Sequence, residues 1–312
     1  MRMRPGCGCG WDRVCRICRA DDDRVGFLPD TRKDSWLAED MITTHKDKAR
    51  LFRSLHSAAR PLALANAWDV ASARLIEAAG APAVATTSAG VAWSLGHPDG
   101  ETLPPDLVVD TIARIAAAVE VPVTADIEGG YGKDASGVAE TVTRVLEAGA
   151  VGINIEDGTR PPAELGARIT AARTAAERAG VPLFVNARTD TYLFGLGDPA
   201  TRLQHTLERA RAYADAGADG IFVPGVTDPA TLAELASGIS VPLNVMAGPG
   251  APNVTELAAL GVARVSLGPG VAQAAYTATR HAARQLYGTG AHHPPADTLS
   301  FPELDGLFPN PR

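Results

Sequence analysis

Short apolar runs alternate with amphipathic segments along most of the chain, and this alternation restricts the folds open to it. The runs are apolar along most of their length, without strict alternation of apolar and polar residues, as in parallel strands buried on both faces. We expect strands at eight runs: Leu62–Ala65, Ala83–Thr86, Val121–Ala125, Val151–Ile155, Leu183–Ala187, Gly220–Val223, Leu243–Met246 and Ala263–Leu267.

The segments between these runs have helical periodicity. Clear examples are Asp69–Ala79, Leu107–Val119, Gly137–Ala148, Ala163–Ala179, Ala200–Ala216 and Val271–Tyr287. Glycines that we expect to end helices in the left-handed conformation are Gly80, Gly149, Gly180, Gly217 and Gly261. Repeated strand–helix units predict an α/β fold, a (β/α)₈ TIM barrel with a C-terminal helical extension. A doubly wound parallel sheet is the alternative.

The composition limits the class of protein. The chain has 312 residues, of which 46% are hydrophobic, enough for one large core. Its net charge of -7 disfavours nucleic acid and anionic membranes as partners. It has no apolar run of the roughly 18 residues that a transmembrane helix needs, and no apolar region of a secretory signal follows Arg2 and Arg4. We therefore expect a cytoplasmic protein without membrane or nucleic-acid partners.

All four cysteines precede residue 19, at Cys7, Cys9, Cys15 and Cys18. Paired cysteines can bind zinc, but this spacing differs from that of zinc fingers and the segment has few core residues. We expect residues 1–40 to be a disordered extension, or a stretch upstream of a true start at Met41. Residues 41–290 would then form the catalytic barrel, and residues 291–312 a C-terminal tail.

Residues 122–132 carry the strongest chemical signal, Pro-Val-Thr-Ala-Asp-Ile-Glu-Gly-Gly-Tyr-Gly. Asp126 and Glu128 come directly after an expected buried strand, where two unpaired carboxylates would repel each other. A divalent cation removes that penalty, and Mg²⁺ suits a site of oxygen ligands, with Mn²⁺ as the alternative ion. Two solvated acids in a polar loop would give the same pattern.

Other polar side chains also follow expected strands, and the carboxyl ends of barrel strands form the active-site face. These residues are Asn66, Asp69, Thr86 to Gly90, Asn154, Glu156, Asp157, Asn186 to Asp190, and Asn244. A single arginine among them, Arg188, cannot neutralise so many carboxylates. The structural alternative is that an Arg188–Glu156 ion pair only supports the barrel.

Four motifs within about residues 50–290 resemble the phosphoenolpyruvate mutase/isocitrate lyase superfamily. They are Asp-Ile-Glu-Gly-Gly-Tyr-Gly at 126–132, Ile-Glu-Asp at 155–157, Asn-Ala-Arg-Thr-Asp at 186–190 and Leu-Gly-His-Pro-Asp at 95–99. The resemblance implies a Mg²⁺-dependent barrel that acts on small 2-oxo or 2-hydroxy acids.

The resemblance also implies a role for individual residues. Asp126 would be the main metal ligand, and Glu128 and Glu156 would hold metal-bound waters. Arg188 would contact the substrate or the migrating group, and Asp99 would close its loop onto the metal. The substrate carboxylate would lie against Thr87 or Ser88 and the backbone N–H groups near Ala89 and Gly90. We also expect Asn186 and Asn244 to bind substrate.

The residues that select the reaction in these relatives are missing. The lyases resemble one another in a Lys-x-Cys-Gly-His loop whose cysteine is the acid, but here Asp157 is followed by Gly-Thr-Arg-Pro-Pro. The phosphorus–carbon enzymes use Lys, Asn and Ser in that loop, whereas the single lysine after Lys48 is Lys133, in another loop. The proton donor would then be His97, Tyr131 or a water, although His97 could be a solvated residue and Tyr131 a packing residue.

We therefore predict a Mg²⁺-dependent enzyme that cleaves or forms a C–C bond in a small 2-oxo or 2-hydroxy carboxylic acid through a metal-stabilised enolate, as a lyase does. Alternatives within the enzyme class are phosphorus–carbon chemistry of the phosphoenolpyruvate mutase or phosphonopyruvate type, and hydrolysis of a 2-oxo acid. A catalytically weak barrel that binds such acids is the alternative outside it.

The C-terminal tail carries apolar side chains that favour assembly. Large ones lie at Leu299, Phe301, Leu304, Leu307 and Phe308, and full burial would contribute about 1.5–3 kcal/mol each. We expect a homo-oligomer, a dimer or tetramer, in which residues 299–308 contribute to the interface. Docking of the tail on its own barrel is the alternative.

Overall fold

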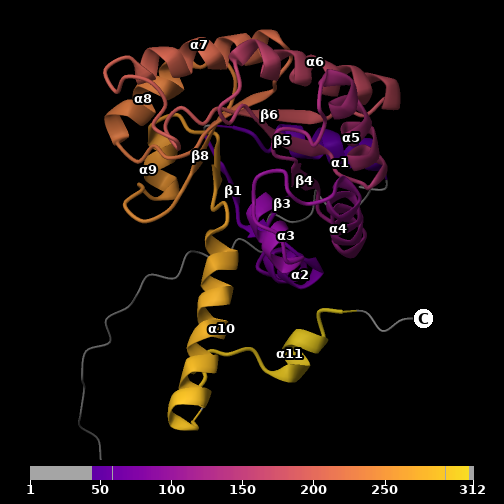
Figure 1. Ribbon diagram of the computed structural model, residues 1–312, viewed down its shortest axis with the longest axis vertical. Coiled ribbons are helices and arrows are strands. Elements are labelled where there is room, and N and C mark those ends of the chain that lie inside the picture. The colour runs from indigo at the N-terminus through magenta and orange to yellow at the C-terminus, as the bar shows by residue number, and fades with distance from the viewer. Residues whose placement is uncertain (1–43, 58, 292, 309–312) are drawn as a thin grey trace, which may run out of the picture. The chain divides into compact units, whose positions relative to one another are not determined.

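The computed structural model describes residues 44–57, 59–291 and 293–308. Its parallel strands follow the order β1-β9-β8-β7-β6-β5-β4-β3-β2 and form a nearly closed barrel surrounded by helices (Figure 1). The predicted first strand is divided into two, and the barrel closes there: β1 (Leu62–Leu64) pairs with β9, whereas β2 (Asn66–Ala67) pairs with β3. The predicted TIM barrel is confirmed, and the doubly wound sheet was the wrong alternative. Residues 1–40 and Met41 lie outside the described residues.

The strands closely match the apolar runs. After the divided first strand, each begins and ends within two residues of its prediction. They are β3 (Val84–Thr86), β4 (Val123–Asp126), β5 (Gly152–Glu156), β6 (Phe184–Arg188), β7 (Gly220–Val223), β8 (Leu243–Met246) and β9 (Arg264–Ser266).

Helices of the barrel lie outside the strands (Figure 1). They are α1 (His45–Ser54), α2 (Val70–Ala78), α3 (Ser88–Ser94), α4 (Pro105–Ala118), α5 (Ala135–Glu147), α6 (Pro162–Ala179), α7 (Arg202–Asp215), α8 (Pro229–Gly238) and α9 (Val254–Ala259), followed by α10 (Gly270–Thr289) and α11 (Phe301–Asp305). All five predicted helix-ending glycines have a positive φ, between 65° at Gly180 and 108° at Gly217. A glycine pays no side-chain penalty in this conformation, so it can turn the chain toward the next strand.

Side chains that point into the barrel form successive layers, because every second strand residue faces the same side. The lower layer is polar and consists of Thr124, Asn154, Asn186, Asn244 and Arg264, all buried. The upper layer lies two residues further along the strands and consists of Asp126, Glu156, Arg188, Met246 and Ser266. The upper layer therefore lies at the carboxyl ends of the strands.

Helix α1 closes the opposite end of the barrel. Its buried Phe52 lies edge-on to Phe184 at the start of β6, with ring centroids 5.7 Å apart. A Cβ on Gly152, at the start of β5, would lie 2.6 Å from the Phe52 ring, so this strand needs a glycine there. Beyond the helix, His56 stacks on Phe184 at 3.8 Å. The lower end is therefore filled by packed aromatic side chains.

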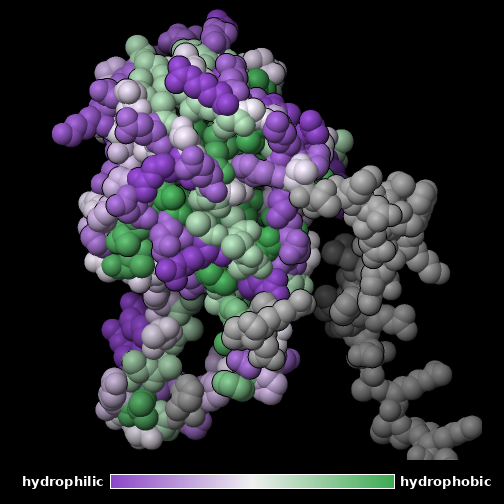
Figure 2. Space-filling model, turned by 90° about the vertical axis from the view of Figure 1, so that its right-hand side faces the viewer, coloured by the Kyte–Doolittle hydropathy of each residue, from purple (hydrophilic) through white to green (hydrophobic). Residues whose placement is uncertain are grey.

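The C-terminal extension is mostly exposed. In α10 the only buried residue is Ala272, and apolar atoms are visible on the surface of the lower part of the molecule in Figure 2. The carbonyl of Leu307 accepts a hydrogen bond from Arg74 Nε in α2 at 2.8 Å, so the end of the tail contacts its own barrel. Phe301 nevertheless remains 80% exposed.

No helix in the described part of the chain has the length and apolar character needed to cross a membrane.

We predict that His56 makes the fold sensitive to acid. Burial, together with the charge of Arg264, lowers the pKa of His56 from 6.5 to about 3. Between these values the unfolded chain binds a proton that the folded chain does not, so the free energy of unfolding should decrease as pH falls below 6.5. One such group contributes up to about 1.4 kcal/mol per pH unit.

Urea unfolding of the wild type and of His56→Phe at pH 7 and pH 5 measures this contribution. The phenylalanine keeps the aromatic stack but cannot titrate, so the wild type should lose more stability between the two pH values than the variant does. Equal losses would contradict the prediction.

Candidate active site

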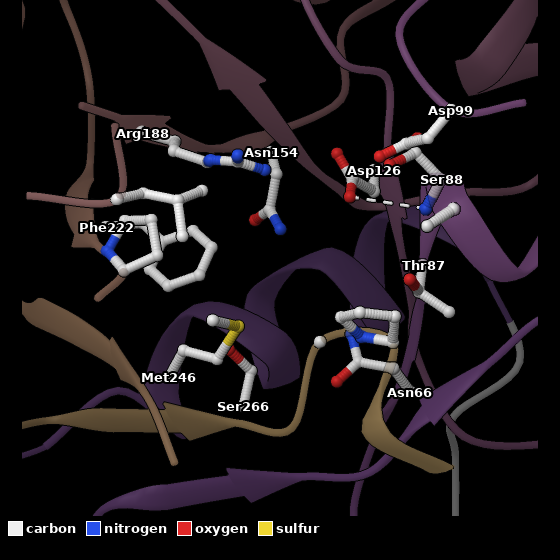
Figure 3. A pocket seen from close by; sticks show the side chains of 15 residues that line it. Asn66, Thr87, Ser88, Asp99, Asp126, Asn154, Arg188, Phe222, Met246 and Ser266 are labelled. Atoms are coloured by element: carbon white, nitrogen blue, oxygen red, sulfur yellow. Dashed lines mark hydrogen bonds between the residues drawn. The ribbon is translucent and has the colours of Figure 1, made fainter. Parts of the chain in front are cut away.

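A cavity of about 160 Å³ lies at the carboxyl ends of the strands (Figure 3). Its walls come from loops and strand ends around most of the ring. They are formed by Asn66, Thr87, Ser88, Ala89, Asp99, Asp126, Asn154, Arg188, Leu193, Phe222, Pro224, Met246, Ser266, Gly268 and Pro269. Carboxylates and an arginine therefore share a small space with apolar side chains.

Asp126 ends β4 and lies at one side of the cavity. Its backbone N–H donates to Thr86 Oγ1 at 2.8 Å, which fixes the end of the strand. Its carboxylate accepts long hydrogen bonds of 3.3 Å from the backbone N–H groups of Ser88 and Glu128 (Figure 3). These neutral donors leave the negative charge of Asp126 unpaired by any arginine or lysine in the described residues.

Asp99 approaches Asp126 from the loop after α3 (Figure 3). Partial burial and the negative charge of Asp126 raise the pKa of Asp99. Its carboxylate would lose this electrostatic cost if a cation lay between the two acids. The pair therefore has the electrostatics expected at the edge of a cation site.

Glu128 does not line the cavity and is hydrogen-bonded to neighbouring loops. It is buried, and its two oxygens accept hydrogen bonds from the backbone N–H of Glu101 and from the Tyr131 hydroxyl. Burial raises the pKa of Glu128, although both donors oppose the rise. Burial, together with the hydrogen bond to Glu128 and the charge of that carboxylate, raises the pKa of Tyr131 and keeps its hydroxyl protonated.

Glu101 joins three loops at this edge of the site. Its carboxylate accepts from the backbone N–H of Tyr131 at 2.9 Å and pairs with Arg160 in the loop after β5. Glu101, Glu128 and Tyr131 all have positive φ, between 50° and 56°, which is unusual for residues with side chains. We call Glu101, Glu128, Tyr131 and Arg160 the loop network.

The glycines of the 126–132 motif make room for the loop network. A Cβ on Gly129 would lie 2.5 Å from Arg160 Nη1, and one on Gly132 would lie 2.4 Å from the backbone nitrogen of Val138. Larger residues would therefore displace Arg160 or the start of α5. This close packing explains why glycine follows the acidic residues.

Arg188 ends β6 and faces the cavity while it pairs with two acids. Its Nη1 lies 2.7 Å from Glu156 Oε2, and its Nε donates to Asp190 Oδ1 at 2.7 Å. The ion pair that we named as a structural alternative is therefore present, but Arg188 also lines the cavity. Burial raises the pKa of Glu156 to about 8, with Arg188 opposing and Asp126 adding to the rise.

Asp157, the last residue of the Ile-Glu-Asp motif, lies outside the cavity lining and supports the ends of β5 and β6. It is fully buried and accepts hydrogen bonds from the backbone of Asp190 at 2.9 Å and from Tyr213 and Arg209 at 2.7 Å each. These bonds hold the ends of β5 and β6 together. Asp157 therefore positions the segments that carry Glu156 and Arg188.

The other predicted site residues lie at different depths. Thr87, Ser88 and Ala89 line the cavity, whereas Gly90 is packed so that a Cβ would lie 2.8 Å from Trp68 and Thr87. Asn186 and Asn244 lie in the lower polar layer and do not line the cavity. His97 also lies outside the lining, with its backbone N–H bonded to Ala92.

Sequence reasoning missed several residues of the site. Phe222 and Met246 lie in apolar runs, where a cavity-lining side chain has the same signature as a core side chain. Glu101 and Arg160 lie in loops, and only their charge beside the recognised motifs could have drawn attention to them.

The chemistry of the site fits a cation held mainly by water. Among the described residues, no three His, Cys, Asp or Glu side chains form a group that could hold a metal by themselves. Mg²⁺ commonly binds through one or two carboxylates and several waters. Asp126 and Asp99 at the cavity, with Glu156 nearby, match that kind of site.

Comparisons with known proteins place the chain among related barrels. The family model for phosphoenolpyruvate phosphomutase matches residues 52–287. The uncharacterised protein Rv1998c of Mycobacterium tuberculosis is 40% identical over 239 residues, which cover 75% of this chain and 88% of the relative. An oxaloacetate decarboxylase of Ectopseudomonas mendocina is 32% identical over 252 residues, covering 78% and 86%. The structure of phosphonopyruvate hydrolase with oxalate and Mg²⁺ is 28% identical in sequence and has a TM-score of 0.73. The match covers 83% of this chain and 94% of the hydrolase.

We predict that Glu101→Ala destabilises the protein, because Arg160 and the Tyr131 N–H lose their shared acceptor. Loss of hydrogen bonds to a partly buried charged group costs about 1–3 kcal/mol. Asp106→Ala is the control, since Asp106 pairs with Arg144 but its side chain is 85% exposed, and exposed pairs contribute about 0–1 kcal/mol. Urea unfolding of both variants measures the difference, and equal losses of stability would show that the loop network contributes no more than a surface ion pair.

Proposed function

Because the chain belongs to the phosphoenolpyruvate mutase/isocitrate lyase superfamily, whose members carry out lyase, mutase and hydrolase reactions on small acids, we propose that it is a Mg²⁺-dependent carbon–carbon lyase. Its substrate would be a small 2-oxo or 2-hydroxy carboxylic acid, and the reaction would pass through an enolate. The observation that carries this proposal is the cavity in which Asp126 and Asp99 lie opposite Arg188 (Figure 3).

Asp126 is the residue that would hold Mg²⁺ directly, with Asp99, Glu128 and Glu156 acting through water. Burial and the negative charge of Asp126 both raise the pKa of Asp99, which supports this assignment, as does the oxalate and Mg²⁺ complex of a related hydrolase. The bound ion would act as a Lewis acid on the substrate. Mn²⁺ has similar preferences for oxygen ligands and is the alternative ion.

Arg188 would bind the substrate from the opposite wall. Glu156 and Asp190 fix its guanidinium from two directions, so a substrate oxygen would meet a positive charge that needs no rearrangement. The hydroxyl groups of Thr87 and Ser88, with the backbone N–H groups of Ala89 and Gly90 at the start of α3, would donate to the substrate carboxylate. The apolar side chains of Phe222, Leu193 and Met246 line the cavity and would reduce the access of water to a bound substrate.

One feature favours carbon–carbon over phosphorus–carbon chemistry. Arg188 is the one cationic residue in the described lining of the cavity, and it already pairs with two acids. A phosphoryl group carries more negative charge than a carboxylate and is usually bound by several cationic or N–H groups. The cavity therefore suits a carboxylic acid better than a phosphonate.

The proton donor in this proposal is a bound water. Tyr131 donates its hydroxyl to Glu128, and its pKa is raised, so it is poorly suited to release a proton. His97 does not line the cavity. A water near Asp99 would reach the substrate without a dedicated acidic side chain.

We predict that Asp126→Ala abolishes Mg²⁺ binding and activity but leaves the barrel folded. The substitution removes repulsion with Asp99, so the metal-free variant should be at least as stable as the wild type. Calorimetric titration with MgCl₂ and thermal unfolding give the two measurements, with Asp106→Ala as the control for loss of an exposed acid. An unchanged Mg²⁺ affinity would rule out Asp126 as the ligand.

The substrate class can be tested by thermal unfolding of the wild type with oxaloacetate, pyruvate, malates, citrates, phosphonopyruvate and oxalate, each with and without MgCl₂. We expect Mg²⁺-dependent stabilisation by 2-oxo or 2-hydroxy acids, followed by product formation from at least one of them. Stabilisation without turnover would favour a binding barrel, and stabilisation by phosphonopyruvate alone would favour phosphorus–carbon chemistry.

We also propose that the protein is a homo-oligomer, a dimer or tetramer, with residues 299–308 at the interface. Tyr287 is 85% exposed and Phe301 80% exposed, and a second copy of the chain would cover them. The contact of Leu307 with Arg74 agrees with the alternative, in which part of the tail docks on its own barrel.

Light scattering of the full chain, of a chain ending at Gly290, and of Phe301→Ser tests this assembly. Particles of the truncated chain and of the serine variant should contain fewer subunits than those of the full chain, because both changes remove Phe301, the most exposed apolar side chain of the tail. Leu107→Ser is the matched control, since Leu107 is an exposed apolar side chain of α4 outside the tail. An unchanged number of subunits after truncation would exclude the tail from the interface.

A further inference from the structure

A fully buried arginine lies below the cavity and has no carboxylate partner among the residues that the structure describes. Arg264, the first residue of β9, has no exposed surface, and its guanidinium lies 5.8 Å from the centroid of the Phe52 ring. The guanidinium makes one hydrogen bond within the described residues, from Nη2 to Asn154 Oδ1 at 3.3 Å. A buried charge with so few hydrogen-bond partners is costly.

Arg264 determines which way the Asn154 amide faces. A guanidinium has donors and no acceptor, so the amide must turn its oxygen toward Arg264. Asn186 Nδ2 donates to the same oxygen at 2.9 Å from the neighbouring strand β6. The reverse orientation would place N–H groups against N–H groups. Two donors in the lower polar layer thus fix the amide in one orientation.

The fixed orientation leaves the Nδ2 group of Asn154 for the cavity. Asn154 lines the cavity, and its Nδ2 makes no hydrogen bond to a described residue, in contrast to Asn66, whose Nδ2 donates to the carbonyl of Thr86 at 3.0 Å. Asn154 pairs in register with Asp126 on the adjacent strand. Figure 3 shows its amide directed into the space between Asp126, Arg188 and Met246.

We propose that Asn154 is a substrate-binding residue that donates from Nδ2 to an oxygen of the bound acid, and that Arg264 is the positioning residue that orients it. The inference rests on the proposed function, because the ligand is the same small carboxylic acid. Asn154 would select an acceptor, a carboxylate or carbonyl oxygen, at the floor of the cavity. Arg188 would bind the acid from the side, so two fixed donors would define its orientation.

Oxalate, with MgCl₂ present, is the probe for this role. Asn154→Asp keeps the shape of the side chain and gives Arg264 a charged acceptor, so the variant should be at least as thermally stable as the wild type. It replaces the donor by an acceptor, so its affinity for oxalate should fall at least tenfold. Asn154→Ala, which adds no charge, should also lose about tenfold and thereby excludes simple repulsion. Both variants should still bind Mg²⁺ alone.

A double-mutant cycle tests the positioning role of Arg264. Arg264→Met should weaken oxalate binding several-fold in the wild-type background, because the Asn154 amide can then turn. In the Asn154→Ala background the same substitution should change the oxalate affinity by less than twofold. A merely structural arginine would change the thermal stability equally in both backgrounds without this difference in affinity.

The outcomes separate this inference from the proposed function. A wild type that binds neither oxalate nor any 2-oxo acid with Mg²⁺ would overturn both. A wild type that binds oxalate, with Asn154→Ala and Asn154→Asp binding it equally well, would overturn the role of Asn154 alone. Equal effects of Arg264→Met in the two backgrounds would overturn the positioning role.

Discussion

Negative charge gathers at the carboxyl ends of β4, β5 and β6, and much of the surrounding structure serves to hold it there. Asp126 and Glu156 end adjacent strands, and Asp99 approaches from a loop. Burial removes the water that would screen these acids, and their pKa values rise as a result for Asp99 and Glu156. Arg188 offsets part of the charge, and a cation beside Asp126 would offset more.

The loops around these acids are fixed by contacts that lie just outside the cavity. Glu101 and Arg160 connect the loops after α3 and β5, while Asp157 holds the ends of β5 and β6 together. The short segment after Asp157 thus holds the loop after α3 in place through the Arg160–Glu101 ion pair.

The sequence predicted the barrel well because its signals are local. Continuous apolar runs and helix-ending glycines such as Gly149 and Gly217 depend on neighbouring residues alone, and the strands and left-handed turns followed them. Strand ends also located Asp126, Glu156 and Arg188 near one another. Depth within the barrel was harder, because Asn154 and Asn186 occupy equivalent strand positions and only three-dimensional packing leaves the amide of one of them facing the cavity. The Glu101–Arg160 pair depends on loops that meet only in the folded chain.

Helix α1, which closes the lower end of the barrel, can dock only late in the synthesis of the chain. Helix α1 is made before any strand, yet its partners lie far along the chain: Arg53 donates to the carbonyl of Leu183, 130 residues later, and pairs with Asp219 further on. The ring itself meets only when β9 reaches β1. Until β6 has left the ribosome, Phe52 cannot pack against Phe184. Helix α1 therefore cannot dock on the barrel until most of the chain has been synthesised.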